Sequence, residues 1–288
     1  MNATADTTTN GTTPAPAPAK LPIVLVHGLW MTPKSWDTWA ERFRAAGHEV
    51  LVPGWPGIDD RSVQDIRSNP AALRGIGLKE IADHYERIIR TLPVKPIIMG
   101  HSFGGVITQM LADRGLGAAY VGVAPGQTAG ITTLPLSTLR TGLPILSNPF
   151  GRNGAKPLSK GHFHFTFGND LNRASSDVLW EQSAVPSYNR VLFEGVAATT
   201  NEKGGVSHVD YARADRAPLL VITGGIDNVV PPAIGKAIVA KYNGTGSPAV
   251  VEYKEYAGRT HRLVSQPGWE EIADYALTWA ASHATVTA

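Results

Sequence analysis

Residues 96–105 read Pro-Ile-Ile-Met-Gly-His-Ser-Phe-Gly-Gly, and this short stretch decides the fold. The first four residues form an apolar run of the kind that becomes a buried strand. An apolar run at 106–111 follows at helical spacing, and Gly115 ends the predicted helix. Ser102 therefore lies in a sharp turn from strand to helix, with Gly100 and Gly104 two residues to either side. This is the pattern of a nucleophile elbow, in which a strained serine presents its hydroxyl.

The same alternation of strand and helix extends in both directions from the elbow. Six apolar runs are typical of parallel strands that are covered on both faces; they are 23–26, 49–52, 96–99, 119–124, 219–223 and 249–253. Amphipathic stretches at 78–92 and 269–279 have apolar residues at spacings of three and four. The chain is thus predicted to form a parallel α/β sheet with right-handed crossovers.

The alternation is interrupted once, and the interruption predicts the domain organisation. Residues 126–213 are rich in Gly, Pro, Ser and aromatics, and a structureless loop of that length is implausible in a compact sheet. We interpret them as a cap or lid inserted into a core of 21–125 and 214–288. Residues 1–20 lack Leu, Ile, Val and Phe and predict a disordered tail. Because no signal-peptide centre is present, we favour a cytoplasmic protein, with a removed leader as the alternative.

Composition excludes several classes of function. Lys and Arg number 26 against 24 Asp and Glu, and no stretch concentrates five or more basic residues. A nucleic-acid or anionic-membrane footprint is therefore not supported. The chain has no cysteine, which excludes disulfides, thiolate nucleophiles and cysteine-based metal sites. No run of 18 apolar residues is present, so we expect no membrane span.

The elbow in this setting resembles the α/β-hydrolase superfamily, whose catalytic triad runs in the order Ser, acid, His. The resemblance implies a mostly parallel sheet of about six strands, flanked by helices and carrying an inserted cap. It also implies that Asp227, the first carboxylate after the run at 219–223, is the acid. Some members of the superfamily place the acid after the strand that follows the elbow helix. Here that position is excluded, because 118–130 contains no Asp or Glu.

The base is expected in the loop after the last strand. His261 is the only histidine between that strand and the C-terminal helix, and we predict that it takes the proton from Ser102. His208, late in the insertion, is the one rival. The resemblance further implies that the His27-Gly28-Leu29-Trp30 loop helps to form the oxyanion hole. Its donors would be the amides of Leu29 and Phe103, while His27 would orient the loop.

A serine nucleophile suits acyl transfer through an acyl-enzyme. We therefore predict a hydrolase of small to medium apolar carboxylic esters, or of lactones and related acyl bonds. No cofactor is expected, and the only expected partner is the small-molecule ester; the oligomeric state stays open. Aromatic residues are the predicted lining of the substrate pocket, namely Trp30, Phe163, Trp180 and Tyr188.

Three alternatives remain beside the ester hydrolase. A lyase or C–C hydrolase could use the same triad, but the related hydroxynitrile lyases have Lys and Thr at the positions of Arg262 and Val24. A receptor-like member would bind its ligand with little turnover. Finally, on a strand His162 and His164 would face the same side and could bind a metal ion, although two ligands alone make a poor metal site.

Overall fold

The computed structural model describes residues 20–58 and 61–285. Six strands form one sheet in the order β2-β1-β3-β4-β5-β6, and every neighbouring pair is parallel. The predicted fold class and all six predicted strands are confirmed. Their bounds are β1 (Ile23–Val26), β2 (Val50–Leu51), β3 (Ile97–His101), β4 (Ala119–Val123), β5 (Leu219–Gly224) and β6 (Val251–Tyr256). Every residue of β1, β3, β4 and β5 is buried, because helices cover both faces of the sheet.

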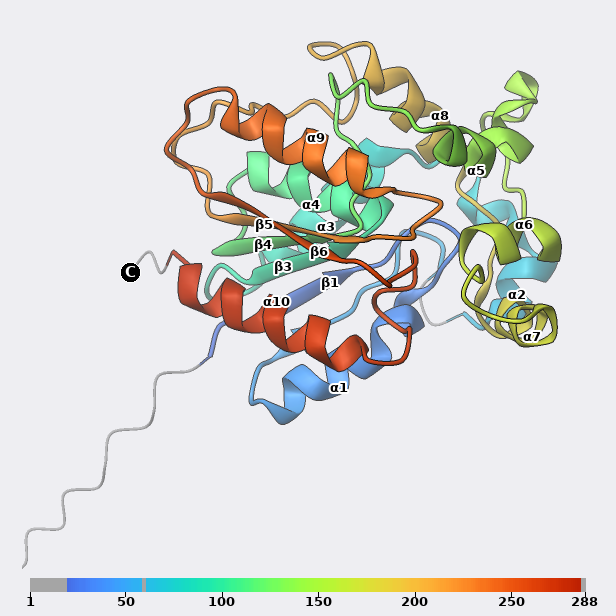
Figure 1. The fold of residues 1–288 in the computed structure, drawn as a ribbon, viewed down its shortest axis with the longest axis horizontal. Coiled ribbons are helices and arrows are strands. Elements are labelled where there is room, and N and C mark those ends of the chain that lie inside the picture. The colour runs from blue at the N-terminus through green and yellow to red at the C-terminus, as the bar shows by residue number, and fades with distance from the viewer. Residues whose placement is uncertain (1–19, 59–60, 286–288) are drawn as a thin grey trace, which may run out of the picture.

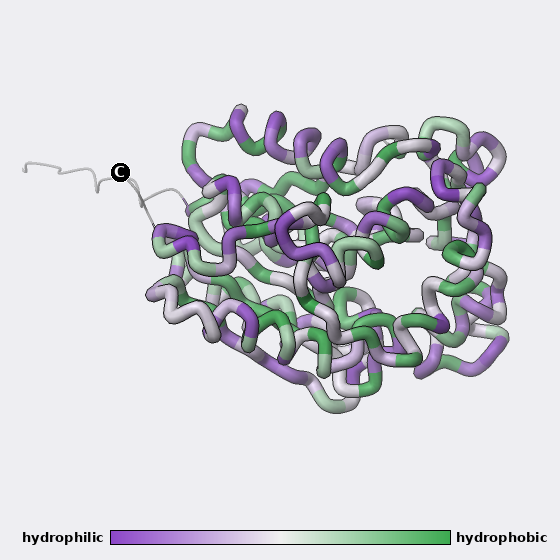
Figure 2. Tube along the Cα trace, turned by 90° about the horizontal axis from the view of Figure 1, so that it is seen from above, coloured by the Kyte–Doolittle hydropathy of each residue, from purple (hydrophilic) through white to green (hydrophobic). Residues whose placement is uncertain are grey.

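Helices cover the two faces of this sheet in two groups (Figure 1). One face carries α3 (Leu78–Ile89), α4 (Phe103–Asp113) and α9 (Pro232–Asn243). The other carries α1 (Asp37–Ala45) and α10 (Trp269–His283), and α3 and α10 contain the two predicted amphipathic stretches. Hydrophobic segments run through the interior of this core, while the outer helix turns alternate between hydrophobic and hydrophilic (Figure 2). The core thus follows the burial pattern that its sequence predicts.

Four further helices lie in the chain between β4 and β5. They are α5 (Leu136–Leu146), α6 (Lys160–Thr166), α7 (Arg173–Ser183) and α8 (Asn189–Thr199), and we call them together the cap. They gather with α2 (Val63–Ser68) at one end of the sheet (Figure 1). Arg67 of α2 donates from Nε to the carbonyl oxygen of Ala184 at 2.8 Å, which ties α2 to the end of α7. Three short 3-10 helices complete the described elements: η1 (Pro33–Trp36), η2 (Pro70–Leu73) and η3 (Pro149–Gly151).

The histidine pair of the cap is placed differently from the sequence interpretation. His162 and His164 lie on the helix α6, where residues two apart point to different sides, so they do not share a face. The predicted tail, 1–20, lies outside the described residues except for Lys20. Within 20–58 and 61–285, no helix is both long enough and apolar enough to cross a bilayer.

Candidate active site

Ser102 occupies a strained corner between β3 and α4. Its backbone has φ 57° and ψ −122°, a conformation that L-residues rarely adopt and that is enriched at functional sites. The flanking glycines allow this corner to form. A Cβ on Gly104 would overlap the carbonyl oxygen of Val26 in β1, and a Cβ on Gly100 would overlap the carbonyl oxygen of Gly104. The predicted turn is therefore present, and close backbone packing explains its glycines.

Asp227 and His261 come together in the loops after β5 and β6. His261 Nδ1 donates to Asp227 Oδ2 at 2.7 Å, and both side chains are completely buried. The other carboxylate oxygen, Oδ1, accepts the amides of Val229 at 2.7 Å and Val230 at 2.9 Å. These three bonds hold the carboxylate rigidly and direct the other ring nitrogen of His261, Nε2, away from Asp227. Among the described residues Nε2 is buried without a hydrogen-bond partner.

A second histidine joins the loop of His261 to the elbow. His101, the residue before Ser102, donates from Nε2 to the backbone carbonyl of His261 at 2.8 Å. The two imidazole rings lie 4.6 Å apart between centroids. Burial and the neighbouring His261 lower the pKa of His101 well below its usual value, so its ring stays neutral. His101 thus fixes the His261 loop beside Ser102 without competing for a proton.

The amides of Leu29 and Phe103 belong to the residues that follow Gly28 and Ser102 in the chain. Gly28 packs so closely on Ser102 that a Cβ there would lie 2.9 Å from the serine Cβ. Phe103 begins α4, so its amide has no acceptor within the helix. Within the described part of the chain, neither amide donates a hydrogen bond. Two backbone amides, one next to Ser102 in the chain and one next to the glycine that packs on it, are therefore without an acceptor among the described residues.

His27 holds the glycine loop in place. Its Nδ1 donates to the carbonyl oxygen of Gly28 at 2.9 Å, and its Nε2 accepts the amide of Trp55 at 3.1 Å. Complete burial lowers the pKa of His27 to about 4, so the ring is neutral near pH 7. Both nitrogens are used in the contacts that orient the loop, as the sequence interpretation expects.

An apolar cavity of about 60 Å³ opens at Ser102, between the core and the cap. Its cap-side wall comes from α5 and α8 and includes Leu139, Leu146 and Leu192, and the wall from the Asp227 loop includes Val229 and Val230. Polar lining is sparse and includes Gln127, Thr138 and Thr141. A cavity with a mainly apolar lining favours ligands with apolar groups.

The four aromatic residues predicted for the pocket divide into two groups. Trp30 lines the cavity. Phe163, Trp180 and Tyr188 do not, because each packs the cap instead.

Phe163 stacks on Phe167 with centroids 5.1 Å apart, and Phe167 in turn packs against His261. Trp180 lies under the guanidinium of Arg67. Tyr188 packs on Trp55 and donates to the carbonyl oxygen of Pro56 at 2.9 Å. Large aromatics carry the most buried area, and this area attaches the cap to the core.

The alternatives raised by the sequence find little support in these contacts. His208 is exposed, bonds through Nδ1 to the carbonyl oxygen of Glu202, and does not line the cavity at Ser102. Arg262 forms an ion pair of 2.6 Å with Asp170 of the cap, and its charge is compensated there. Among the residues described, no group of three or more His, Cys, Asp or Glu could hold a metal.

A model of the α/β-hydrolase family matches residues 23–274. The chain belongs to this family. A methylesterase of Arabidopsis thaliana, methylesterase 10, is 25% identical over 256 residues, which cover 82% of this chain and 83% of that protein. A carbendazim-hydrolyzing esterase of Nocardioides sp. (strain SG-4G) is 30% identical over 95 residues, covering 32% of this chain and 35% of the esterase.

Solved structures show the same fold. The monoacylglycerol lipase of Paleococcus ferrophilus superposes with a TM-score of 0.62 at 19% identity, over 91% of this chain and 94% of the lipase. The methylesterase MES16 of Arabidopsis superposes with a TM-score of 0.62 at 14% identity, over 91% of this chain and the whole of the other. At these low sequence identities, the two structures support the α/β-hydrolase fold of this chain and nothing beyond the fold.

Sequence reasoning missed all of the cap residues at the cavity and one link between the cap and the His261 loop. Leu139, Leu146 and Leu192 carry no motif that sets them apart from other leucines of the cap. The pair of Arg262 with Asp170 joins residues 92 positions apart, and no local pattern connects them. His101 could have been found, since it lies inside the elbow motif, but its bond to His261 is a tertiary contact.

Proposed function

We propose that this α/β hydrolase cleaves carboxylic esters with Ser102 as nucleophile, His261 as general base and Asp227 as its orienting acid. One observation carries the proposal: Asp227 holds His261 through Nδ1, the carbonyl of His261 accepts from His101 of the elbow, and Nε2 is buried without a partner among the described residues. A buried polar nitrogen without a partner needs a physical explanation. The hydroxyl of Ser102, or the atoms that react there, would supply the partner that Nε2 lacks.

The reaction would run in two halves. In the first, Ser102 Oγ bonds to the acyl carbon and its proton passes to His261 Nε2. The tetrahedral intermediate then collapses, the ester C–O bond breaks, and the alkoxide leaves with the proton from Nε2. In the second half, a water molecule repeats these steps on the acyl-enzyme, which releases the acid and restores the Ser102 hydroxyl.

Charge develops on the carbonyl oxygen in both halves. The amides of Leu29 and Phe103 would donate to this oxyanion, because Phe103 follows Ser102, Leu29 follows the glycine that packs on Ser102, and neither amide has another acceptor among the described residues. Loss of one such donor costs about 10²–10³ in rate where side-chain donors have been tested. Asp227 would stabilise the imidazolium that forms on His261 without taking the proton itself.

The cavity supports a small to medium apolar ester as substrate. Its walls are mainly aliphatic, and none of the described residues that line it carries a charged side chain. The names of the relatives agree with this chemistry, since two are esterases by name and one similar structure is a lipase. We place the acyl or alkyl group of the ester against Leu146 and Leu192 of the cap.

Hydrolysis of p-nitrophenyl acetate and butyrate tests the proposal, with Ser102→Ala beside the wild type and a fluorophosphonate to label the nucleophile. We expect sustained turnover, labelling at Ser102, and a loss of about 10⁴-fold or more in Ser102→Ala. Thr108→Ser, a neighbouring hydroxyl residue of α4 that contacts Gly104, is the matched control and should keep most of the activity.

Two results would contradict the proposal. Labelling at another residue would remove Ser102 from its role as nucleophile. One stoichiometric release of p-nitrophenol without further turnover would favour the receptor-like alternative instead.

A further inference from the structure

Helix α5 of the cap has its apolar side outward. Leu136, Leu139 and Leu143 follow one another at spacings of three and four residues, so they form one stripe. Leu136 is 84% exposed and Leu143 is 61% exposed, and Phe150 in the following η3 is fully exposed. A surface helix normally presents polar residues to solvent and apolar ones to the core. We call Leu136, Leu139, Leu143 and Phe150 the apolar patch.

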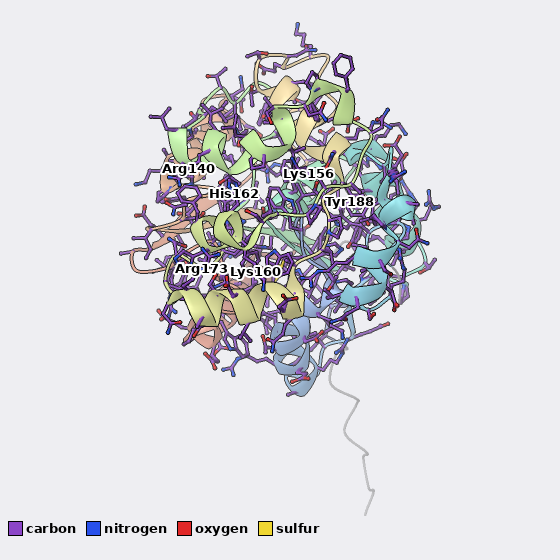
Figure 3. The ribbon with its side chains drawn as sticks, turned by 90° about the vertical axis from the view of Figure 1, so that its right-hand side faces the viewer. Arg140, Lys156, Lys160, His162, Arg173 and Tyr188 are labelled. Carbon is purple, nitrogen blue, oxygen red and sulfur yellow. The ribbon has the colours of Figure 1, made fainter. Side chains whose placement is uncertain are left out.

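The surroundings of the apolar patch are cationic. Residues 114–169 contain no Asp or Glu. Three exposed cations, Arg140, Arg152 and Lys156, lie in or next to α5 and η3 in sequence, and none forms an ion pair with a described residue. Arg140 stacks on Phe165, and Lys156 Nζ donates to the carbonyl oxygen of Pro144 at the end of α5. Figure 3 shows Arg140 and Lys156 on the face of the cap that looks away from the core.

The apolar patch adjoins the cavity at Ser102. Leu139 belongs to the exposed stripe and also lines the cavity, and Leu146 continues the cavity wall at the end of the same helix. An apolar molecule that leaves a surface held against the patch would therefore meet Leu139 as part of the cavity wall, beside Thr138 and Thr141 of the same helix. A molecule bound at the patch would therefore lie next to the cavity at Ser102.

We propose that the apolar patch and its three cations form a docking surface for an anionic lipid bilayer. The leucines and Phe150 would enter the boundary between headgroups and acyl chains, and the cations would meet the lipid phosphates. No basic cluster is visible in the sequence because the cations are dispersed over 140–156. The exposed apolar stripe becomes evident only when the helix is placed on the core.

The charges favour a lipid surface over a second copy of the chain. In a symmetric dimer through this patch, the same surface of both copies would meet, and six cations would gather with no carboxylate from 114–169 to balance them. An anionic bilayer supplies the opposite charge over the whole patch. The inference concerns binding and does not depend on the proposed ester hydrolysis.

Co-sedimentation of the full chain with phosphatidylcholine vesicles, with and without phosphatidylserine, tests the docking surface. Binding should be strong on the mixed vesicles at low salt, and it should weaken on pure phosphatidylcholine and at high salt. The triple variant Leu136→Ser, Leu143→Ser, Phe150→Ser should bind at least about tenfold more weakly, since three apolar side chains no longer enter the lipid. None of these three residues lines the cavity.

A charge variant and a control separate the two contributions. Arg152→Gln with Lys156→Gln should weaken binding to the mixed vesicles by about tenfold or more and leave pure phosphatidylcholine unaffected. Val94→Ser, an exposed apolar residue before β3, should bind as the wild type does.

Circular dichroism and turnover of p-nitrophenyl acetate confirm that each variant is folded. In the sedimentation experiment, Ser102→Ala should bind vesicles as the wild type does. Loss of hydrolysis can therefore be told apart from loss of membrane binding. No sedimentation with the mixed vesicles at low salt, or equal binding of the triple variant, would overturn the inference. A dimer in analytical ultracentrifugation that the triple variant dissociates would assign the patch to a second copy instead.

Discussion

The core and the cap of this protein bury their residues in opposite ways. In the core, four strands are buried at every position, and glycines around Ser102 allow backbones to touch. In the cap, helix α5 turns leucines outward and contributes only part of one face to the cavity. A close-packed region tolerates little change in shape, whereas an exposed helix face tolerates much. We therefore expect the proposed chemistry to depend on the core and the choice among substrates to depend on the cap.

The largest difference between the two regions is expected for carboxylate substitutions. Asp227→Asn should reduce kcat for p-nitrophenyl butyrate by about 10⁴-fold, because the amide no longer fixes the His261 tautomer. Asp177→Asn in cap helix α7 removes a half-buried carboxylate that pairs with Arg173, and it should leave kcat within about twofold. Similar kcat values for the two variants would contradict a catalytic role for Asp227.

A second prediction concerns the glycines of the elbow. Gly104→Ala places a Cβ against the carbonyl oxygen of Val26, and we expect the free energy of unfolding to fall by about 3 kcal/mol or more. The control is Gly258→Ala, where no described residue beyond the two chain neighbours lies within 4 Å of the added Cβ, and the change should be below about 0.5 kcal/mol. Urea denaturation measures both. An equally stable Gly104→Ala protein would mean that β1 and α4 are less tightly packed than the structure shows.

Acid should destabilise the core through its buried histidines. Burial lowers the pKa of His27 from 6.5 to about 4 in the folded chain, so between these values the unfolded chain binds more protons. The free energy of unfolding should therefore be fully retained above pH 6.5 and fall by about 3 kcal/mol as the pH drops to 4. Urea denaturation of His27→Asn should show a shallower pH dependence than the wild type, while Val94→Ser keeps the wild-type slope. Equal slopes for all three proteins would contradict burial as the cause.

The smallest effect is expected at the cap. Leu139→Ala removes part of the cavity wall, and kcat/KM for the butyrate should fall by about threefold relative to the acetate. Leu136→Ala, one turn earlier and outside the cavity, should leave this ratio unchanged. Both leucines are exposed, so neither variant should lose more than about 0.5 kcal/mol of stability. If only Leu136→Ala changed the ratio, Leu136 and not Leu139 would contact the substrate, and the prediction would be wrong.

Much of the core could be predicted because its signals are local. Each strand is a short apolar run beside a turn, and the elbow around Ser102 is a contiguous motif. Asp227 and His261 can be proposed from sequence because each follows a strand, and parallel strands bring their ends to the same edge of the sheet. The pocket residues Phe163, Trp180 and Tyr188 were misplaced because an aromatic side chain packs equally well against a cavity or against a neighbouring helix.

The sequence by itself determined the order of strands and helices, the strained serine turn and the two loops that carry its partners. These features depend on neighbours within a few residues, where sterics and apolar periodicity act directly. Only the tertiary structure decided which leucines of the cap reach Ser102 and which remain at the surface. That choice depends on how separate helices pack across the molecule, and periodicity along one helix does not specify its partner.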